Sequence, residues 1–256
     1  MLKLFKPLSL VLFLIFIFCQ TSFAQVSRSS RSSKTAKGRI YSFGLGFSLG
    51  NTDQNDLNQV IRDSKAYSGT DNSLLIQSYE YVSFLSMKLP NNMYALQLRA
   101  TFLNQISNGT GVGPVGMGAS GTYKYELNGY TIFPIIKYTA LTNDIISLYF
   151  NAGFGYGWLD GKILNGNRSV AFTGSAFGSQ IGAGLDFCFF AEHCVQIEGR
   201  YRYLPVVQNK VSSSVGLLPD GIGKATVGKE IESTSGSNLT TSLTGVSGTL
   251  SYIYNF

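Results

Sequence analysis

The chain has 256 residues, of which 44% are hydrophobic and only 13% are charged, about half the charged share of an average soluble domain. That hydrophobic content excludes an intrinsically disordered chain. Glycine, tyrosine and phenylalanine are abundant, with 29, 15 and 18 copies, and this balance favours extended strands over a helical bundle.

The N-terminus has the pattern of a secretory signal peptide. A basic start is followed by an apolar run over residues 10–18, and the small residues Ser22 and Ala24 precede a predicted cleavage site after residue 24. The run is too short for a membrane-spanning helix, which needs about 20 apolar residues. Phe18 is bulky where a lipoprotein signal has a small residue before its cysteine, which disfavours lipidation of Cys19.

The positive charge of the chain, formally +6, is concentrated near its start. Residues 25–38 are predicted to be a flexible, serine-rich periplasmic arm, and this segment together with Arg39 holds five basic residues and no acidic one. From Ile40 onward, 13 basic residues stand against 14 acidic ones, which disfavours a nucleic-acid-binding surface on the body. The arm is either a solvated segment or a contact for an anionic lipid surface or cell-wall polymer.

Alternation with a period of two residues predicts strands throughout the rest of the chain. In the first run, every odd position from Tyr41 to Leu49 is large and apolar, and the even positions are glycine or serine. The run over residues 145–158 repeats this design and is long enough to cross a bilayer as a tilted strand, which takes about 9 to 11 residues. The eight predicted strands cover residues 39–49, 74–89, 93–102, 123–138, 145–158, 173–189, 195–203 and 241–256.

Two of these strands carry finer predictions. In the second, the outward-facing set starts at Leu75 and Tyr79. In the fourth, apolar residues stand at odd positions from Tyr123 to Leu127 and at even positions from Tyr130 onward. A β-bulge near Asn128–Gly129 would keep all of them on one face.

The connections alternate in length. Short turns are predicted near Asn91, Asn143 and Glu192, whereas the other four links cover residues 50–73, 103–122, 159–172 and 204–240. Short turns on one rim and long loops on the other are the outer-membrane arrangement. In the first long link, Leu57, Val60 and Ile61 have helical spacing, which fits a short helix or a collapsed coil. The last long link is either a partner site or the most disordered segment.

Alternation alone does not say which face points outward, so a soluble lipocalin-like barrel competes with a membrane barrel. A soluble barrel must present charged side chains to water, but here the second face consists largely of glycine and serine. We therefore place the apolar face against lipid and the few charges inside. The predicted lumen charges are Glu80, Lys88, Arg99, Asp186, Glu198, Arg200 and Arg202.

The glycine-alternating stretch over residues 151–158 and the ending Tyr252-Ile-Tyr254-Asn-Phe256 carry a family resemblance. Over residues 39–256 the chain resembles the small outer-membrane β-barrel proteins, OmpA/OmpX-like and often called porin-family proteins. The resemblance implies an eight-stranded antiparallel up-and-down barrel in the outer membrane of a Gram-negative cell envelope, surrounded by its lipids. It also implies that Tyr252, Tyr254 and Phe256 serve as a signal for the barrel-assembly machinery, reached with periplasmic chaperones. Ser251 stands where that signal usually carries glycine.

The sequence predicts no catalytic site, metal site or cofactor. Residues 111–116 match the dinucleotide fingerprint by letter, but they lack the strand before and the helix after. His193 is the only histidine and falls in a short turn, which disfavours a hydrolytic triad and a lipid-modifying enzyme. Cys188 and Cys194 lie opposite each other if a three-residue turn is centred on Ala191, and a disulfide is predicted there.

Two functions remain. The first is a barrel without catalytic activity whose loops serve binding, adhesion or envelope integrity. The alternative is a narrow porin-like channel for small solutes or ions, in which the inward glycines leave a water-filled gap beside Arg99, Arg200 and Arg202.

Overall fold

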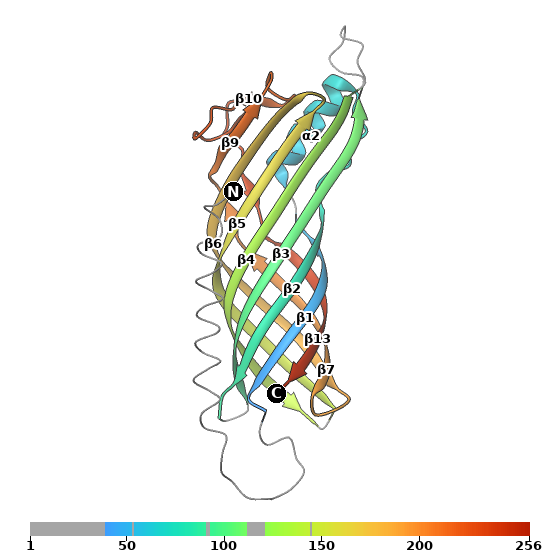
Figure 1. The fold of residues 1–256 in the computed structure, drawn as a ribbon, viewed down its shortest axis with the longest axis vertical. Helices are drawn as coiled ribbons and strands as arrows, with labels where there is room; N and C mark the ends of the chain where they lie inside the picture. Colours follow the sequence, from blue (N-terminus) through green and yellow to red (C-terminus); the bar gives the residue numbers. More distant parts are fainter. Residues whose placement is uncertain (1–38, 53, 91–92, 112–120, 144) are drawn as a thin grey trace, which may run out of the picture. The chain divides into compact units, whose positions relative to one another are not determined.

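The computed structural model describes residues 39–52, 54–90, 93–111, 121–143 and 145–256. The predicted leader, residues 1–24, and the predicted arm, residues 25–38, lie outside these ranges. The described chain forms an all-β antiparallel barrel in which eight strands close into a ring (Figure 1). The ring runs β1, β2, β3, β4, β5, β6, β7 and β13, and β13 returns to β1. The fold class predicted from the alternation is confirmed.

The ring strands have unequal lengths. Their bounds are β1 (Tyr41–Asn51), β2 (Gln77–Lys88), β3 (Tyr94–Gly111), β4 (Gly121–Thr142), β5 (Ile146–Asn165), β6 (Arg168–Cys188), β7 (His193–Tyr203) and β13 (Gly245–Asn255). The start of β1 and the end of β13 lie at one rim, where the amide of Phe256 donates to the carbonyl of Tyr41 over 2.9 Å. β3 to β6 are 18 to 22 residues long and extend beyond their shorter neighbours at the opposite end.

This extension corrects two of the predicted loops. Residues 103–122 are largely strand, apart from residues 112–120, which lie outside the described chain together with most of the dinucleotide-like segment. Residues 159–172 are also largely strand, and β5 and β6 are joined by a tight turn at Gly166, whose φ of 62° suits glycine. The strands continue because residues beyond the predicted ends still bury an apolar face.

The predicted bulge at Asn128–Gly129 is wrong. Pairing of β3 with β4 runs without a shift from Tyr94 opposite Tyr138 to Gly111 opposite Gly121. The alternation changes phase because the apolar residues move from the outside of the barrel to its inside. Tyr123, Tyr125 and Leu127 point inward and are buried.

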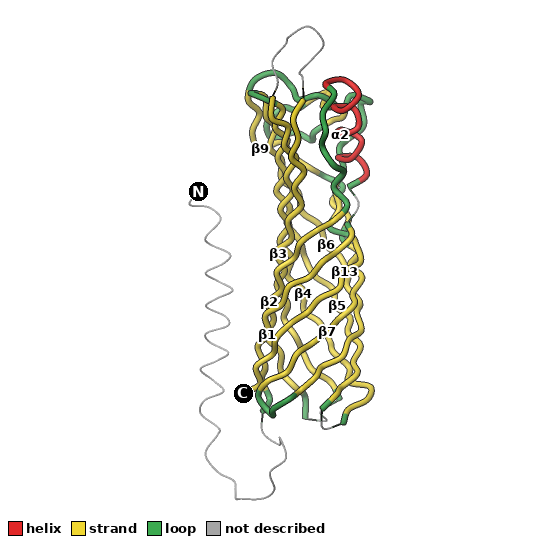
Figure 2. The backbone as a smooth tube through the Cα atoms, turned by 90° about the vertical axis from the view of Figure 1, so that its right-hand side faces the viewer, coloured by secondary structure: helices red, strands yellow, loops and turns green. Residues whose placement is uncertain are grey.

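The other two long links fold over the end of the barrel where β3 to β6 extend (Figure 2). The first contains the helix α2 (Asn55–Ser68), which buries Leu57, Val60 and Ile61 and ends at Gly69 in a left-handed conformation. Leu75, predicted to face outward, is buried here as well, because it precedes β2 and packs into the same cluster. No helix in the described ranges is long and apolar enough to span a membrane.

The last long link has regular structure of its own. It contains the short strands β8 (Pro205–Val206), β9 (Asn209–Val215), β10 (Ile222–Lys224) and β11 (Glu232–Ser233), and β12 (Thr241–Ser242) follows it. β9 pairs with the extended part of β6, and β8 pairs with β12. We call α2 and residues 204–244 the cap.

Candidate functional site: the barrel interior and the cap

The centre of the lumen holds a buried ion pair between Arg99 of β3 and Glu198 of β7. Two guanidinium nitrogens of Arg99 donate to the two carboxylate oxygens of Glu198, over 2.5 and 2.7 Å. Tyr149 and Asn151 of β5 each donate a further hydrogen bond to Glu198 Oε2 over 2.8 Å. The pair is buried, with 2% of the Arg99 side chain and none of the Glu198 side chain exposed. The hydrogen bonds supply the compensation that a buried pair needs.

A second cluster lies around Glu80 of β2. Arg200 and Arg202 of β7 both pair with its carboxylate, Arg202 over 2.8 Å. Arg200 Nε also donates to Ser247 Oγ over 2.8 Å, and Arg202 Nε donates to the carbonyl of Leu243 over 2.6 Å. Because all three charged groups come from alternate, inward positions of their strands, the small-residue face is the lumen face.

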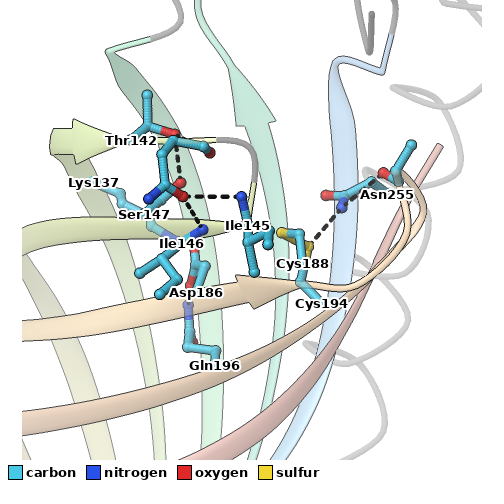
Figure 3. The surroundings of a disulfide bond; sticks show 12 residues. Lys137, Thr142, Ile145, Ile146, Ser147, Asp186, Cys188, Cys194, Gln196 and Asn255 are labelled. Carbon is cyan, nitrogen blue, oxygen red and sulfur yellow. Dashed lines mark hydrogen bonds and ion pairs between the residues drawn. A yellow bond between two sulfur atoms is a disulfide. The ribbon is translucent and has the colours of Figure 1, made fainter.

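Towards the rim with the short turns, Lys137 of β4 pairs with Asp186 of β6 over 2.5 Å, and Gln196 donates to the other Asp186 oxygen over 2.8 Å (Figure 3). Lys88 has the same inward parity but ends its strand and is exposed. Lys137 and Tyr149 belong to this network, although neither was among the predicted lumen residues. Inward parity on β4 and β5 is the signal that would have included them.

At this rim a disulfide between Cys188 and Cys194 links β6 and β7 next to the turn that joins them (Figure 3). The two cysteines are directly paired across β6 and β7, and Asn255 Nδ2 donates to Cys194 Sγ over 3.3 Å. Together with Val82, Phe84 and Ile253 they form a small apolar cluster in the lumen. His193 stands at the start of β7, and its Nδ1 shares a hydrogen bond with the Tyr252 hydroxyl. No group of described residues has the His, Cys, Asp or Glu ligands for a metal ion.

At the opposite end the lumen is filled by a large apolar cluster. Leu103, Leu127 and Leu159 of the extended strands are fully buried. They pack with Leu57 of α2 and Leu204 of the cap in one continuous cluster. The cap therefore occupies the mouth of the barrel as a folded apolar core.

The inward glycines make room for this filling. A Cβ at Gly157 would lie 2.8 Å from Leu204, and one at Gly155 would lie 2.7 Å from the Phe133 ring. Bulky neighbours occupy the space beside these two glycines.

Polar contacts hold the cap in place. Asp56 of α2 accepts hydrogen bonds from both the amide and the hydroxyl of Thr240, over 2.8 and 2.6 Å. The Tyr125 hydroxyl donates to Ser64 Oγ over 2.7 Å, and burial raises the pKa of Tyr125 to about 12. Such contacts join the helix, the last link and the ring strands into one body.

The outer surface of the ring is apolar between the cap and the rim with the short turns. Leu45 and Phe43 of β1, Ile136 of β4 and Ile181 of β6 have between 42% and 58% of their surface exposed. Two aromatic rows border this belt. One contains Phe102, Tyr130 and Trp158, with Phe102 and Tyr130 5.1 Å apart between ring centres, and the other contains Tyr41, Tyr94, Tyr138, Tyr254 and Phe256.

Charges inside and apolar side chains outside are the reverse of a soluble protein, and aromatic rows at both borders are typical of a barrel in lipid. The chain is a membrane-spanning β-barrel of the outer-membrane type. We call the part of the ring between the two aromatic rows the membrane zone. The extended parts of β3 to β6 beyond Phe102, Tyr130 and Trp158, together with the cap, form the extracellular zone.

No protein-family model and no curated protein sequence matches the chain. Among solved structures, it is similar to the outer membrane protein OprG from Pseudomonas aeruginosa, with 11% identity over 87% of this chain and 99% of that one and a TM-score of 0.48. It is similar to Ail, the attachment invasion locus protein of Yersinia pestis, with 15% identity over 85% and 99% and a TM-score of 0.42. It is also similar to Neisserial surface protein A, with 9% identity over 88% and 100% and a TM-score of 0.44. These likenesses are distant, and the assignment above rests on this chain's own ring and belt.

Proposed function

We propose that the protein is a non-catalytic outer-membrane barrel that holds its cap rigidly outside the cell for binding, adhesion or envelope integrity. The observation that carries this proposal is the filled interior. Ion pairs occupy the middle of the lumen, and clusters of buried apolar residues lie towards both of its ends. A barrel of eight strands that is packed in this way acts as a support, not a passage.

The cap offers a surface for such a role. Tyr67 of α2, Val215 of β9, and Leu217 and Val227 of the last link have 60% to 70% of their surface exposed, although they belong to the extracellular zone. We infer that these side chains contribute to a contact surface, because contiguous apolar patches exposed to water mark sites for a partner. The body beneath them is ordered, so the ligand meets a preformed surface.

Biogenesis supplies further partners. Tyr252 and Tyr254 of β13, and Phe256 directly after it, have 42% to 50% of their surface exposed on the outside of the barrel. They are accessible from the side of the last strand, as recognition by the barrel-assembly machinery requires. Periplasmic chaperones precede that step, and outer-membrane lipids surround the product.

The alternative function is a narrow channel. It is favoured by buried polar atoms in the lumen that have no hydrogen-bond partner in the described chain, including both amide atoms of Gln180, Thr131 Oγ1 and Arg202 Nη1. Ordered water would satisfy them. A channel would need this water to be continuous through both apolar clusters.

Planar-bilayer recording of refolded residues 25–256 separates the two functions, after heat-modifiable gel mobility has confirmed a closed barrel. A silent bilayer is expected. Reproducible unitary steps that shift when Arg200 is replaced by alanine would overturn the display proposal in favour of the channel.

The cap is tested in cells. Replacement of Tyr67, Leu217 and Val227 by serine should reduce the adhesion of cells that express the protein while its outer-membrane level stays unchanged. The matched control replaces Phe43 and Leu45 by valine, which keeps the lipid face apolar. Equal adhesion of the cap variant and wild type would contradict an adhesive cap.

A further inference from the structure

The lipid face of the membrane zone contains a shallow depression. It has a volume of about 550 Å³, and Phe150, Ile181, Tyr201 and Val246 are among its lining residues. These side chains belong to β5, β6, β7 and β13, and each has 43% to 61% of its surface exposed. The depression is thus on the outside of the barrel and continuous with the apolar belt.

Ala183 and Gly199 are small residues that line the hollow, and the strand register extends their row to Gly248. Ala183 of β6, Gly199 of β7 and Gly248 of β13 are directly paired across three adjacent strands. All three have outward parity, so the outer surface lacks large side chains over a width of roughly 10 Å. Phe150 stands at one end of this row, opposite Ala183. We call the depression the small-residue groove.

The two glycines are not required by the fold. A Cβ at Gly199 or Gly248 would meet no atom within 4 Å. A Cβ at any other glycine of the described strands would have an atom within that distance. Both lie within ordinary strands and have no positive φ. Glycine in a strand interior costs stability and often marks the close approach of a ligand or another backbone.

We propose that the small-residue groove binds one acyl chain of a membrane lipid in preference to the surrounding lipid. The groove lies between the two aromatic rows, at the depth where hydrocarbon is the solvent. Its walls are apolar, with Ile181, Tyr201 and Val246 in one cross-strand row on the extracellular side. Ile197 and Leu250 form the row on the other side. A methylene chain in the groove gains contacts on its floor and on both walls, whereas a chain on the open belt gains them on one side only.

This inference depends on the membrane location and not on what the cap binds. Its test fills the groove. Gly199→Leu and Gly248→Leu place side chains where the structure has open space, so both variants are expected to close, which heat-modifiable mobility verifies. Ala100→Leu is the matched control, because Ala100 is another small residue on the lipid face, on β3.

The probe is phosphatidylcholine carrying a spin label midway along one acyl chain, in vesicles of phosphatidylcholine that contain the refolded barrel. Electron spin resonance gives the number of motionally restricted chains per barrel. Wild type and Ala100→Leu should restrict equally many, and the double groove variant should restrict one fewer. Equal numbers in all three proteins would overturn the proposal.

A second copy of the barrel is the competing occupant. The two native cysteines of the barrel are joined to each other, so Gly199→Cys introduces a single reactive thiol there. Low cross-linking at high lipid-to-protein ratio supports the acyl chain. Efficient dimer formation at that ratio would overturn the proposal and assign the groove to the second copy.

Discussion

The membrane zone and the extracellular zone share the strands β3 to β6. The large apolar side chains lie mainly outside the barrel in the first zone and mainly inside it in the second. On β3, Arg99 and Thr101 point into the lumen and Leu98 points outward, whereas two residues further up Leu103 is buried inside and Asn104 lies outside. The pairing of β3 with β4 continues through this point without a shift. The pairing of the strand is therefore the same in both zones, and only its surroundings differ.

The same exchange occurs on β5, where Trp158 faces outward and the next residue, Leu159, is fully buried inside. Asp160 and Lys162 then face outward. In lipid the apolar residues gain by facing out, and in water they gain by facing in. The comparison shows that the solvent around each part of a barrel, and not strand geometry, decides which face is apolar.

The largest expected effect concerns the polar core of the membrane zone. Glu198→Ala leaves the Arg99 guanidinium buried without its carboxylate, and removal of one member of a buried pair costs about 3 to 5 kcal/mol. Urea unfolding of the refolded barrel in lipid vesicles measures this loss. The matched control is Glu192→Ala, which breaks a pair with Arg39 whose side chains are 44% and 32% exposed. That pair is worth about 1 kcal/mol or less, and equal losses in both variants would show that the lumen is hydrated.

A lysine scan locates the border between the zones. Leu98→Lys and Ile106→Lys change two outward residues of β3 with similar exposure, 37% and 44%. Lysine at a lipid-facing position near the bilayer midplane costs about 2 to 4 kcal/mol, and it costs almost nothing in water. The unfolding free energy should therefore fall only for Leu98→Lys. A similar loss for Ile106→Lys would move the membrane border up the strand.

The sequence predicts the membrane zone better than the extracellular zone, for a physical reason. Alternation identifies every ring strand and the lumen side of Glu80, Arg99 and Glu198, because one face there is uniformly apolar. Beyond the aromatic row the apolar face changes sides. In a single strand, this change looks the same as the one-residue shift that a β-bulge produces. Only the pairing of β3 with β4 distinguishes the two cases.

The sequence also does not predict which side chains contact one another inside the barrel. Arg99 and Glu198 are 99 positions apart and meet only because the ring closes. Leu204 and Leu243 fill the mouth because the last link folds inward, which its polar composition does not indicate. Parity assigns a side chain to the lumen, but the curvature and stagger of the ring decide which side chain it meets.

The smallest expected effect tests whether water reaches the core of the extracellular zone, and it appears only at high pH. Tyr125 is fully buried, donates to Ser64 and has a pKa raised from 10.0 to about 12 by burial, with the charge of Asp220 acting in the same direction. Below pH 10 the phenol is protonated in both the folded and the unfolded chain, and stability is unaffected. Between about pH 10 and 12 the unfolded phenol ionises while the folded one keeps its proton, so stability falls as pH rises, by up to about 2.7 kcal/mol.

Urea midpoints of wild type and Tyr125→Phe across this pH range isolate the effect, because the other tyrosines titrate in both proteins. The phenylalanine variant loses the hydrogen bond to Ser64, so it starts less stable by about 1 kcal/mol. Its deficit should shrink and then reverse as pH rises. Parallel curves would mean that water reaches Tyr125, and the extracellular zone would then be a loose cover over the barrel instead of a second protein core stacked on a membrane one.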